Sequence, residues 1–421
     1  MTSNPHVLIA LLGKNPREAR YVIQDDDTRK ERRHLFCFMA LEEYFRECGE
    51  PVNELIILGT PSSHWHILGK TFLGREDGDE ALQTLEQKCS KNGITQTDLN
   101  TLQEQLNSNR RNDRPSVQLR CISYAGSTEE QRDLLHLLEH LTPENGRVTF
   151  DLTHSLRHLS MLGMLAATAL RRLKNIRMEV YFGAFEMSCL EEWDGRSPVL
   201  RLSAFEDMSA LQEALASFEQ YGDYGVLASI FDRLDASDLA EKLRKASFAE
   251  HLGNFDEAAR HIKAAQEALG RLSAQHPLAF LVEKLRERLT WPEQAGDLYA
   301  RQRNRALFAL KKNDFMRAAL WGTEAFKTRL MIGMGQDPSD TAQRRGVRLN
   351  NNASFNAAGL ANEHNLFKKL YALRNRLGHM HLAEQNQQDA IEQAVDQALE
   401  DPARCHSFLE ECLQQLLPER P

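Results

Sequence analysis

Short apolar runs rich in branched residues alternate with helical stretches through the first half of the chain, and no such run follows Asp207. Runs of this kind, bounded by Gly, Pro, Asn or Ser, are typical of buried strands. Because helical stretches separate them, the strands can lie parallel in one sheet with helices on both faces. We therefore predict a Rossmann-like, doubly wound α/β domain with a mostly parallel sheet over residues 1–206. Its strands are expected at His6–Leu12, Glu54–Leu58, Gln118–Tyr124, Arg147–Leu152 and Ile176–Phe182, with Pro198–Leu202 as a sixth.

Helical spacing accounts for most of the remaining sequence. In the first half it predicts helices over Arg32–Cys48, Glu80–Lys91, Asp98–Asn107, Ser127–Leu141 and Leu156–Leu173. Residues 207–421 show only helical patterns, which predicts an all-α domain. The segment Gly335–Glu363 is rich in Asn and Gly and is expected to be a loop. It carries Arg344, Arg345 and Arg348, so it is either a plain surface loop or a contact for an RNA backbone.

Length and composition narrow the classes of function. A chain of 421 residues exceeds what one core usually holds, which implies at least two domains. A net charge of −8 argues against a protein that coats nucleic acid, so any nucleic-acid site must be a local patch or pocket. The seven cysteines include no CxxC pair, which indicates neither a zinc ribbon nor a disulfide framework. We expect a soluble cytoplasmic protein with no membrane span, metal or cofactor.

Small, hydroxylic and cationic residues follow three of the expected strands. In open α/β sheets, ligands bind beyond the carboxyl ends of the strands. Backbone N–H groups, hydroxyls and cations together suit a phosphate-containing ligand. Neither a GxGxxG nor a P-loop pattern is present, so a dinucleotide cofactor and an NTPase are unsupported. For the residues Asp151–Ser155, which follow the third of these strands, a simple helix cap is the alternative interpretation. The candidate ligand residues are Gly13, Lys14, Asn15, Thr60, Pro61, Ser62, Ser63, Asp151, Thr153, His154, Ser155 and Arg157.

The stretch Arg374-Asn375-Arg376-Leu377-Gly378-His379 is the candidate catalytic motif of the helical half. Asn375 and His379 share one helix face, away from a stripe of leucines, whereas Arg374 and His379 point about 140° apart. An imidazole can transfer protons and a guanidinium can hold a phosphorane charge, as RNA cleavage without a metal requires. A solvated helix face is the plainer interpretation of the spacing alone. Gly378 would suit a helix end or a close approach by a second copy.

The two motifs in this order resemble those of the Csx-one/Csm-six group of type III CRISPR ancillary ribonucleases. Asp151-Leu152-Thr153-His154-Ser155 is similar to the Asp-x-Thr-His-Gly signature of their CARF domain, with Ser155 where glycine is usual. Arg374, Asn375 and His379 match the Arg-Asn-x-x-x-His form of their HEPN motif. The resemblance covers nearly the whole chain.

The resemblance implies a ligand-gated endoribonuclease. A homodimer, which can assemble further, would bind a cyclic oligoadenylate made by the type III effector complex. We expect cyclic tetra-adenylate, with the hexa-adenylate as the alternative. Single-stranded RNA would then be cut without a metal, leaving a 2′,3′-cyclic phosphate and a 5′-hydroxyl. The resemblance implies proton transfer by His379, phosphate binding by Arg374 and positioning by Asn375.

Two other functions stay open from the sequence. A nucleotide-sensing regulator or adaptor would bind a partner through a non-catalytic helical domain. In an addition to the nuclease interpretation, the sensing domain would also cleave its own activator slowly, with Lys14, Ser62 or His154 placed for in-line attack. Plain binding of the activator is the simpler expectation for the sensing domain.

Overall fold

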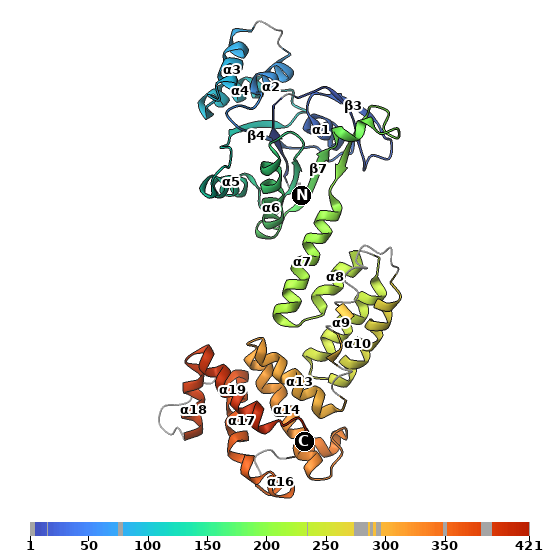
Figure 1. Ribbon diagram of the computed structural model, residues 1–421, viewed down its shortest axis with the longest axis vertical. Coiled ribbons are helices and arrows are strands. Elements are labelled where there is room, and N and C mark those ends of the chain that lie inside the picture. Colours follow the sequence, from blue (N-terminus) through green and yellow to red (C-terminus); the bar gives the residue numbers. More distant parts are fainter. Residues whose placement is uncertain are drawn as a thin grey trace. The chain divides into compact units, whose positions relative to one another are not determined.

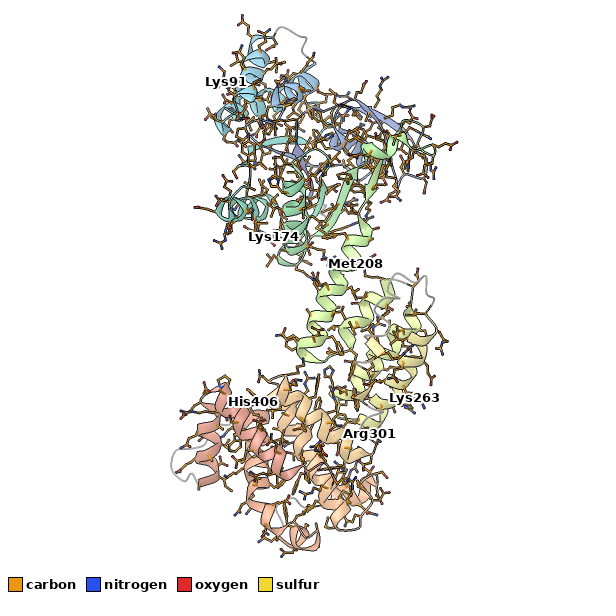
Figure 2. All side chains as sticks on the ribbon, viewed as in Figure 1. Lys91, Lys174, Met208, Lys263, Arg301 and His406 are labelled. Atoms are coloured by element: carbon orange, nitrogen blue, oxygen red, sulfur yellow. The ribbon has the colours of Figure 1, made fainter. Side chains whose placement is uncertain are left out.

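The computed structural model describes residues 5–14, 16–74, 79–233, 235–272, 285–286, 289–291, 296–347, 352–379 and 390–420 (Figure 1). The chain divides into two compact units, Met1–Ser209 and Ala210–Pro421. Figure 2 shows the side chains of both units, with Lys174 directly after helix α6 and Lys263 on helix α10. None of the described helices is long and apolar enough to cross a bilayer.

The first unit is built on an eight-stranded sheet of order β3-β2-β8-β7-β6-β1-β4-β5. All its strand pairs are parallel except β2 with β3 and β7 with β8. The predicted mostly parallel α/β sheet is confirmed. The strands are β1 His6–Leu12, β2 Ala19–Ile23, β3 Glu31–His34, β4 Glu54–Gly59, β5 Ser116–Cys121, β6 Arg147–Asp151, β7 Arg177–Gly183 and β8 Ser197–Arg201.

Helices pack on both faces of this sheet, as a doubly wound fold requires. Strand β1 shows the two faces directly, because Leu8, Ala10 and Leu12 enter one core whereas Val7, Ile9 and Leu11 enter the other. The first core includes residues of α1, α2 and α4, and the second includes residues of α5 and α6. The helical elements are α1 Cys37–Glu47, α2 Trp65–Leu73, α3 Glu80–Ser90, α4 Gln96–Ser108, α5 Thr128–Leu141, α6 Arg157–Leu173 and the 3-10 helix η1 Phe185–Cys189.

The helix predicted over Arg32–Cys48 is wrong at its beginning. Residues 31–34 form β3, which pairs with β2 in antiparallel fashion, and α1 begins only at Cys37. The Arg32 side chain is buried at 1% exposure because its guanidinium pairs with Asp26 at 2.8 Å and with Glu47 at 2.6 Å. The local sequence pattern around Arg32 does not show these ion pairs, because neither partner is next to it in the sequence. The Arg-rich strand therefore has the same pattern as the polar beginning of a helix.

The second unit is helical throughout its described residues, and the all-α prediction is confirmed. One core gathers residues of α7 to α10, and another gathers residues of α13, α14, α17, α18 and α19. The helices are α7 Ser203–Tyr221, α8 Gly225–Arg233, α9 Ser237–His251, α10 Phe255–Gly270, α13 Leu298–Lys311, α14 Phe315–Gly333, α15 Thr341–Gly346, α16 Asn352–Ala357, η3 Ala361–Glu363, α17 His364–His379, α18 Ala390–Leu399 and α19 Pro402–Leu416.

The loop predicted over 335–363 is wrong in part, since α15, α16 and η3 lie within it. Asp340 caps α15 by accepting hydrogen bonds from the amides of Ala342 and Gln343. Arg344 on α15 then donates to Glu324 Oε2 at 2.5 Å, which attaches the short helix to α14. Arg344 is therefore occupied within the chain, whereas Arg348 lies outside the described residues.

Candidate functional site

The loops that follow β1, β4 and β6 meet at one edge of the sheet, as the sequence predicted. These strands are neighbours in the order β6-β1-β4. A Cβ added to Gly13 would lie 3.1 Å from the backbone carbon and oxygen of His154, so the loops after β1 and β6 are in close contact. The carbonyl of Gly13 accepts a hydrogen bond of 3.1 Å from the amide of His64, in the loop after β4. Glycine at position 13 permits this approach of two backbones.

Thr60, Ser62 and Ser63 are buried residues, at 5%, 2% and 1% exposure. Ser63 Oγ donates to the carbonyl of Leu12 at 2.6 Å and accepts from the amide of Thr60 at 2.9 Å. Thr60 Oγ1 lies 3.3 Å from Ser62 Oγ and 3.2 Å from Ser63 Oγ. These hydroxyls thus join the ends of β1 and β4. Their neighbour Pro61 is half-buried.

Asp151 and Thr153 organise the end of β6. Asp151 is fully buried, and its Oδ1 accepts from the amide of Thr153 at 3.0 Å and from its hydroxyl at 2.5 Å. Thr153 Oγ1 also accepts from the amide of Gly183 at 2.8 Å, which joins β6 to β7. Burial raises the pKa of Asp151 to about 6, against the lowering effect of Thr153, the Phe38 amide and the Cys37 thiol. The helix-cap interpretation fails for α6, because Leu156 is its N-cap and no side chain caps it.

His154 faces the start of α1. Its Nε2 accepts a hydrogen bond from the Cys37 amide at 3.2 Å and lies 3.4 Å from the Tyr21 hydroxyl. Its ring packs against Phe36 and Phe185. Burial lowers the pKa of His154 to about 4, so the imidazole is neutral at pH 7. Its bond to α1 makes it a positioning group in this structure.

Two of the predicted ligand residues carry exposed cations. Lys14 follows β1 and Arg157 begins α6, and both are exposed. Burial, and then the charge of Lys14, lowers the pKa of His64. Ser155 Oγ lies 2.6 Å from Ser160 Oγ, and Asn15 lies outside the described residues. The edge therefore offers two cations, backbone groups and the uncapped N-terminus of α6.

We expect acid to destabilise the first unit, because the folded state disfavours protonation of His154. The stabilising contribution is complete above the unfolded pKa of 6.5 and is lost as the pH falls toward about 4. His6, whose pKa is likewise lowered to about 4, adds to this loss. At pH 5, the lowered pKa of each of these two histidines reduces the free energy of unfolding by about 2 kcal/mol.

Asp151 opposes this trend. Its raised pKa favours the folded state in acid, and that contribution is lost as the pH rises through about 6. Two histidines outweigh one carboxyl, so thermal unfolding should begin at a lower temperature at pH 5 than at pH 7. The variant His154→Gln should show a shallower dependence on pH. An unchanged slope in this variant would contradict the assignment.

The second candidate site lies on α17. Leu370 and Leu373 are fully buried, and Leu366 and Leu377 are half-buried, which confirms the predicted leucine stripe. Arg374 and Asn375 are half-buried beside this stripe.

Arg374 and Asn375 are joined by a hydrogen bond, in which Arg374 Nη1 donates to Asn375 Oδ1 at 2.9 Å. His379 is the last residue of α17, about 7.5 Å further along the helix axis than Arg374. The asparagine can therefore hold the guanidinium in place.

The neighbours of this motif have separate roles. Arg376 donates to Glu392 at 2.9 Å and to Asp396 at 2.7 Å, and so binds α17 to α18. Among the described residues, no atom lies within 4 Å of a Cβ added to Gly378. A close approach at Gly378 therefore does not come from the described part of this chain. His381, the next histidine after His379 in the sequence, lies outside the described residues.

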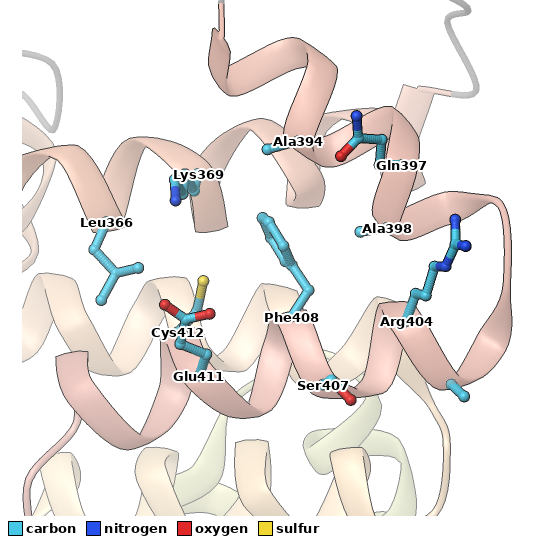
Figure 3. A pocket seen from close by; sticks show the side chains of 11 residues that line it. Leu366, Lys369, Ala394, Gln397, Ala398, Arg404, Ser407, Phe408, Glu411 and Cys412 are labelled. Carbon is cyan, nitrogen blue, oxygen red and sulfur yellow. The ribbon is translucent and has the colours of Figure 1, made fainter.

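A cavity of about 670 Å³ lies between α17, α18 and α19 (Figure 3). In Figure 3, Phe408 of α19 points toward α17, and Lys369 of α17 lies on the opposite wall. None of the residues that line this cavity belongs to the Arg374–His379 motif. No group of three or more His, Cys, Asp or Glu suited to a metal ion occurs within the described ranges.

Comparison with known proteins identifies the first unit. Residues 7–185 match the family described as "CRISPR system endoribonuclease Csx1, CARF domain". A CRISPR-associated protein of Methanocaldococcus jannaschii is 22% identical over 211 residues, and the match covers 47% of this chain but only 33% of that protein. Csm6 of Enterococcus italicus, solved with cyclic hexa-2′-fluoro-hexa-dAMP, aligns over 100% of this chain and 96% of its own at 11% identity and a TM-score of 0.37, too low to support an argument about the site. The family match covers residues 7–185, which are therefore similar to the CARF domain of Csx1-type CRISPR endoribonucleases.

Proposed function

We propose that this protein is a ribonuclease activated by a cyclic oligoadenylate. Residues 1–206 would sense the ligand, and residues 207–421 would provide a helical linker and a HEPN nuclease domain. The observation that carries the proposal is the CARF match over residues 7–185, with the Arg374–His379 motif in the helical unit that follows. In this proposal the protein acts in type III CRISPR defence, and the type III effector complex makes the activator.

The proposed ligand site is the edge formed by the loops after β1, β4 and β6. Lys14 and Arg157 supply positive charge, and the N-terminus of α6 supplies amide groups that no side chain caps. Amides at a helix N-terminus favour phosphate. Asp151, Thr153 and His154 hold these loops in place through their internal hydrogen bonds. We expect cyclic tetra-adenylate to be the activator.

A homodimer completes the proposal. Met161 and Leu165 lie one turn apart on α6 and are 68% and 64% exposed, an apolar pair that a second copy would cover. A cyclic ligand on a two-fold axis would then meet the same loops twice. Positions 374 and 379 of an ideal helix lie about 140° apart around its axis, so two copies of α17 would together surround one phosphate. The activator must bind more tightly to the active arrangement of this dimer.

In the proposed reaction, His379 takes the proton of the RNA 2′-hydroxyl or donates one to the leaving 5′-oxygen. Arg374 binds the phosphate as negative charge develops, and Asn375 orients Arg374. The 2′-oxygen attacks phosphorus, and the bond from phosphorus to the 5′-oxygen breaks.

RNA cut in EDTA with cyclic tetra-adenylate should carry a 2′,3′-cyclic phosphate and a 5′-hydroxyl. Mass spectrometry of a short oligonucleotide tests this directly. Products with a 5′-phosphate, or a need for a divalent ion, would contradict the mechanism.

A further inference from the structure

Tyr124 lies in the loop after β5, and the hydroxyl of its side chain is firmly bound. It donates to Ser62 Oγ at 2.8 Å, with Asn92 Oδ1 as a second acceptor 3.3 Å away. Ser62 is itself 2% exposed and lies 3.3 Å from Thr60 Oγ1. The sequence prediction placed Tyr124 at the end of a strand, but β5 ends at Cys121 and Tyr124 belongs to the loop beyond it.

The hydrogen bonds extend from Tyr124 across the ligand edge. Thr60 Oγ1 lies 3.2 Å from Ser63 Oγ, which donates to the carbonyl of Leu12 at the end of β1. A continuous chain of hydroxyls therefore runs from the loop after β5, through the loop after β4, to β1. Buried networks of this kind fix the orientation of the groups at their ends.

The backbone of Tyr124 is also held. His158, in the first turn of α6, lies with its Nε2 2.7 Å from the carbonyl oxygen of Tyr124. The next residue, Ala125, is 2% exposed and has a φ of +52°. A left-handed conformation at a residue other than glycine is unfavourable, and such strain persists where the surrounding structure enforces it. The loop is thus held in one conformation beside the α6 terminus.

Tyr124 as a residue is nevertheless 37% exposed, whereas Tyr21 and Tyr181 in the same unit are 0% and 2% exposed. The hydrogen bond of its hydroxyl already restricts the rotation of the Tyr124 side chain. The side chain therefore loses little conformational entropy when a flat ligand stacks on it. The neighbouring groups of the edge are the cations Lys14 and Arg157, which suit phosphates. If these cations bind the phosphates, the base is the part of the nucleotide that is left to contact Tyr124.

We infer that Tyr124 is a nucleobase-stacking residue of this sensing site, and that Ser62 is the positioning residue that orients its ring. The inference rests on the proposed function, since it assigns the adenine of the cyclic oligoadenylate to the Tyr124 ring. Base–aromatic stacking is sequence-tolerant, so Tyr124 supplies affinity, and other groups select adenine.

Binding of fluorescently labelled cyclic tetra-adenylate to the full chain tests the inference. Tyr124→Leu should raise Kd by about 10- to 100-fold, in line with the usual contribution of one stacked base. The matched control is Tyr221→Leu, which replaces a tyrosine of 55% exposure on α7 and should leave Kd unchanged. A Kd within threefold of the wild type for a folded Tyr124→Leu would overturn the inference.

A double-mutant cycle tests the positioning role and does not depend on Tyr124→Leu being folded. Tyr124→Phe keeps the ring and loses the hydroxyl, and Ser62→Ala removes its partner. Each should raise Kd by about fivefold, the usual effect of one hydrogen bond. The double variant should be no weaker than either single one, because both remove the same interaction. Additive effects would overturn the role of Ser62. Absence of any binding by the wild-type chain would instead contradict the proposed function, and the inference with it.

Discussion

Replacing His379 by alanine is expected to lower the rate of RNA cleavage by about a thousandfold, the usual contribution of a general acid or base. Arg374→Ala should lose about a hundredfold or more, because the developing phosphate charge is then left without its cation. Asn375→Ala should lose less, since it removes only the 2.9 Å hydrogen bond that holds Arg374. All three variants should bind cyclic tetra-adenylate as the wild type does, because the proposed ligand site lies in the other unit.

The helical unit offers a matched control for these variants. His406→Ala removes a half-buried histidine of α19 (Figure 2) and should leave cleavage unchanged. Mixed dimers of Arg374→Ala and His379→Ala subunits should recover part of the activity, because the shared site then keeps one Arg374 and one His379 from different subunits. Full activity in both single variants would exclude the motif as the catalytic site. No recovery in mixed dimers would contradict the sharing of a site between subunits.

Removing either member of the ion pair between Glu250 and Arg305 should lower the free energy of unfolding by about 3–5 kcal/mol. Glu250 on α9 and Arg305 on α13 have side chains only 4% and 5% exposed. The Arg305 guanidinium also lies 4.4 Å from the ring centre of Phe308 and 5.2 Å from that of Trp291. Because α9 belongs to one core of the helical unit and α13 to the other, the pair joins the two cores.

Two comparisons separate the effect of an unpaired buried charge from lost packing. The double variant Glu250→Leu, Arg305→Met should lose much less than the sum of the single losses, because no charge is left unpaired. The control pair is Arg301 with Asp256, whose side chains are 21% and 58% exposed, and Arg301→Ala should cost below about 1 kcal/mol. Chemical denaturation followed by tryptophan fluorescence measures all of these. A loss below 1 kcal/mol in either single variant at the buried pair would contradict this account.

The local sequence pattern was sufficient to predict the buried strands of the sheet. Strand β1 has the predicted bounds His6–Leu12 because all its residues are buried and none but His6 is polar. Strand β3 was missed because it is an edge strand whose charged side chains pair with residues outside the strand. Arg32 pairs with Asp26 and Glu47, and the pattern of neighbouring residues does not predict ion pairs that form only in the folded chain.

The candidate site shows the same limit. The rule that ligands bind beyond the carboxyl ends of parallel strands grouped Gly13, Thr60 and His154 correctly. The sequence could not show which side chains are available there. Asp151 and Ser63 bind groups supplied by α1 and β1, and only the folded chain brings these together. The roles of Arg374, Asn375 and His379 in cleavage stay predictions.

The most direct test of ligand-gated cleavage is the initial rate at which the full chain cuts a fluorogenic single-stranded RNA in EDTA, without ligand and with cyclic tri-, tetra- or hexa-adenylate. We expect negligible cleavage without ligand, strong cleavage with cyclic tetra-adenylate, and none when His379→Ala replaces the wild type. Equal rates with and without ligand, or no cleavage with any of the three rings, would contradict ligand-gated cleavage.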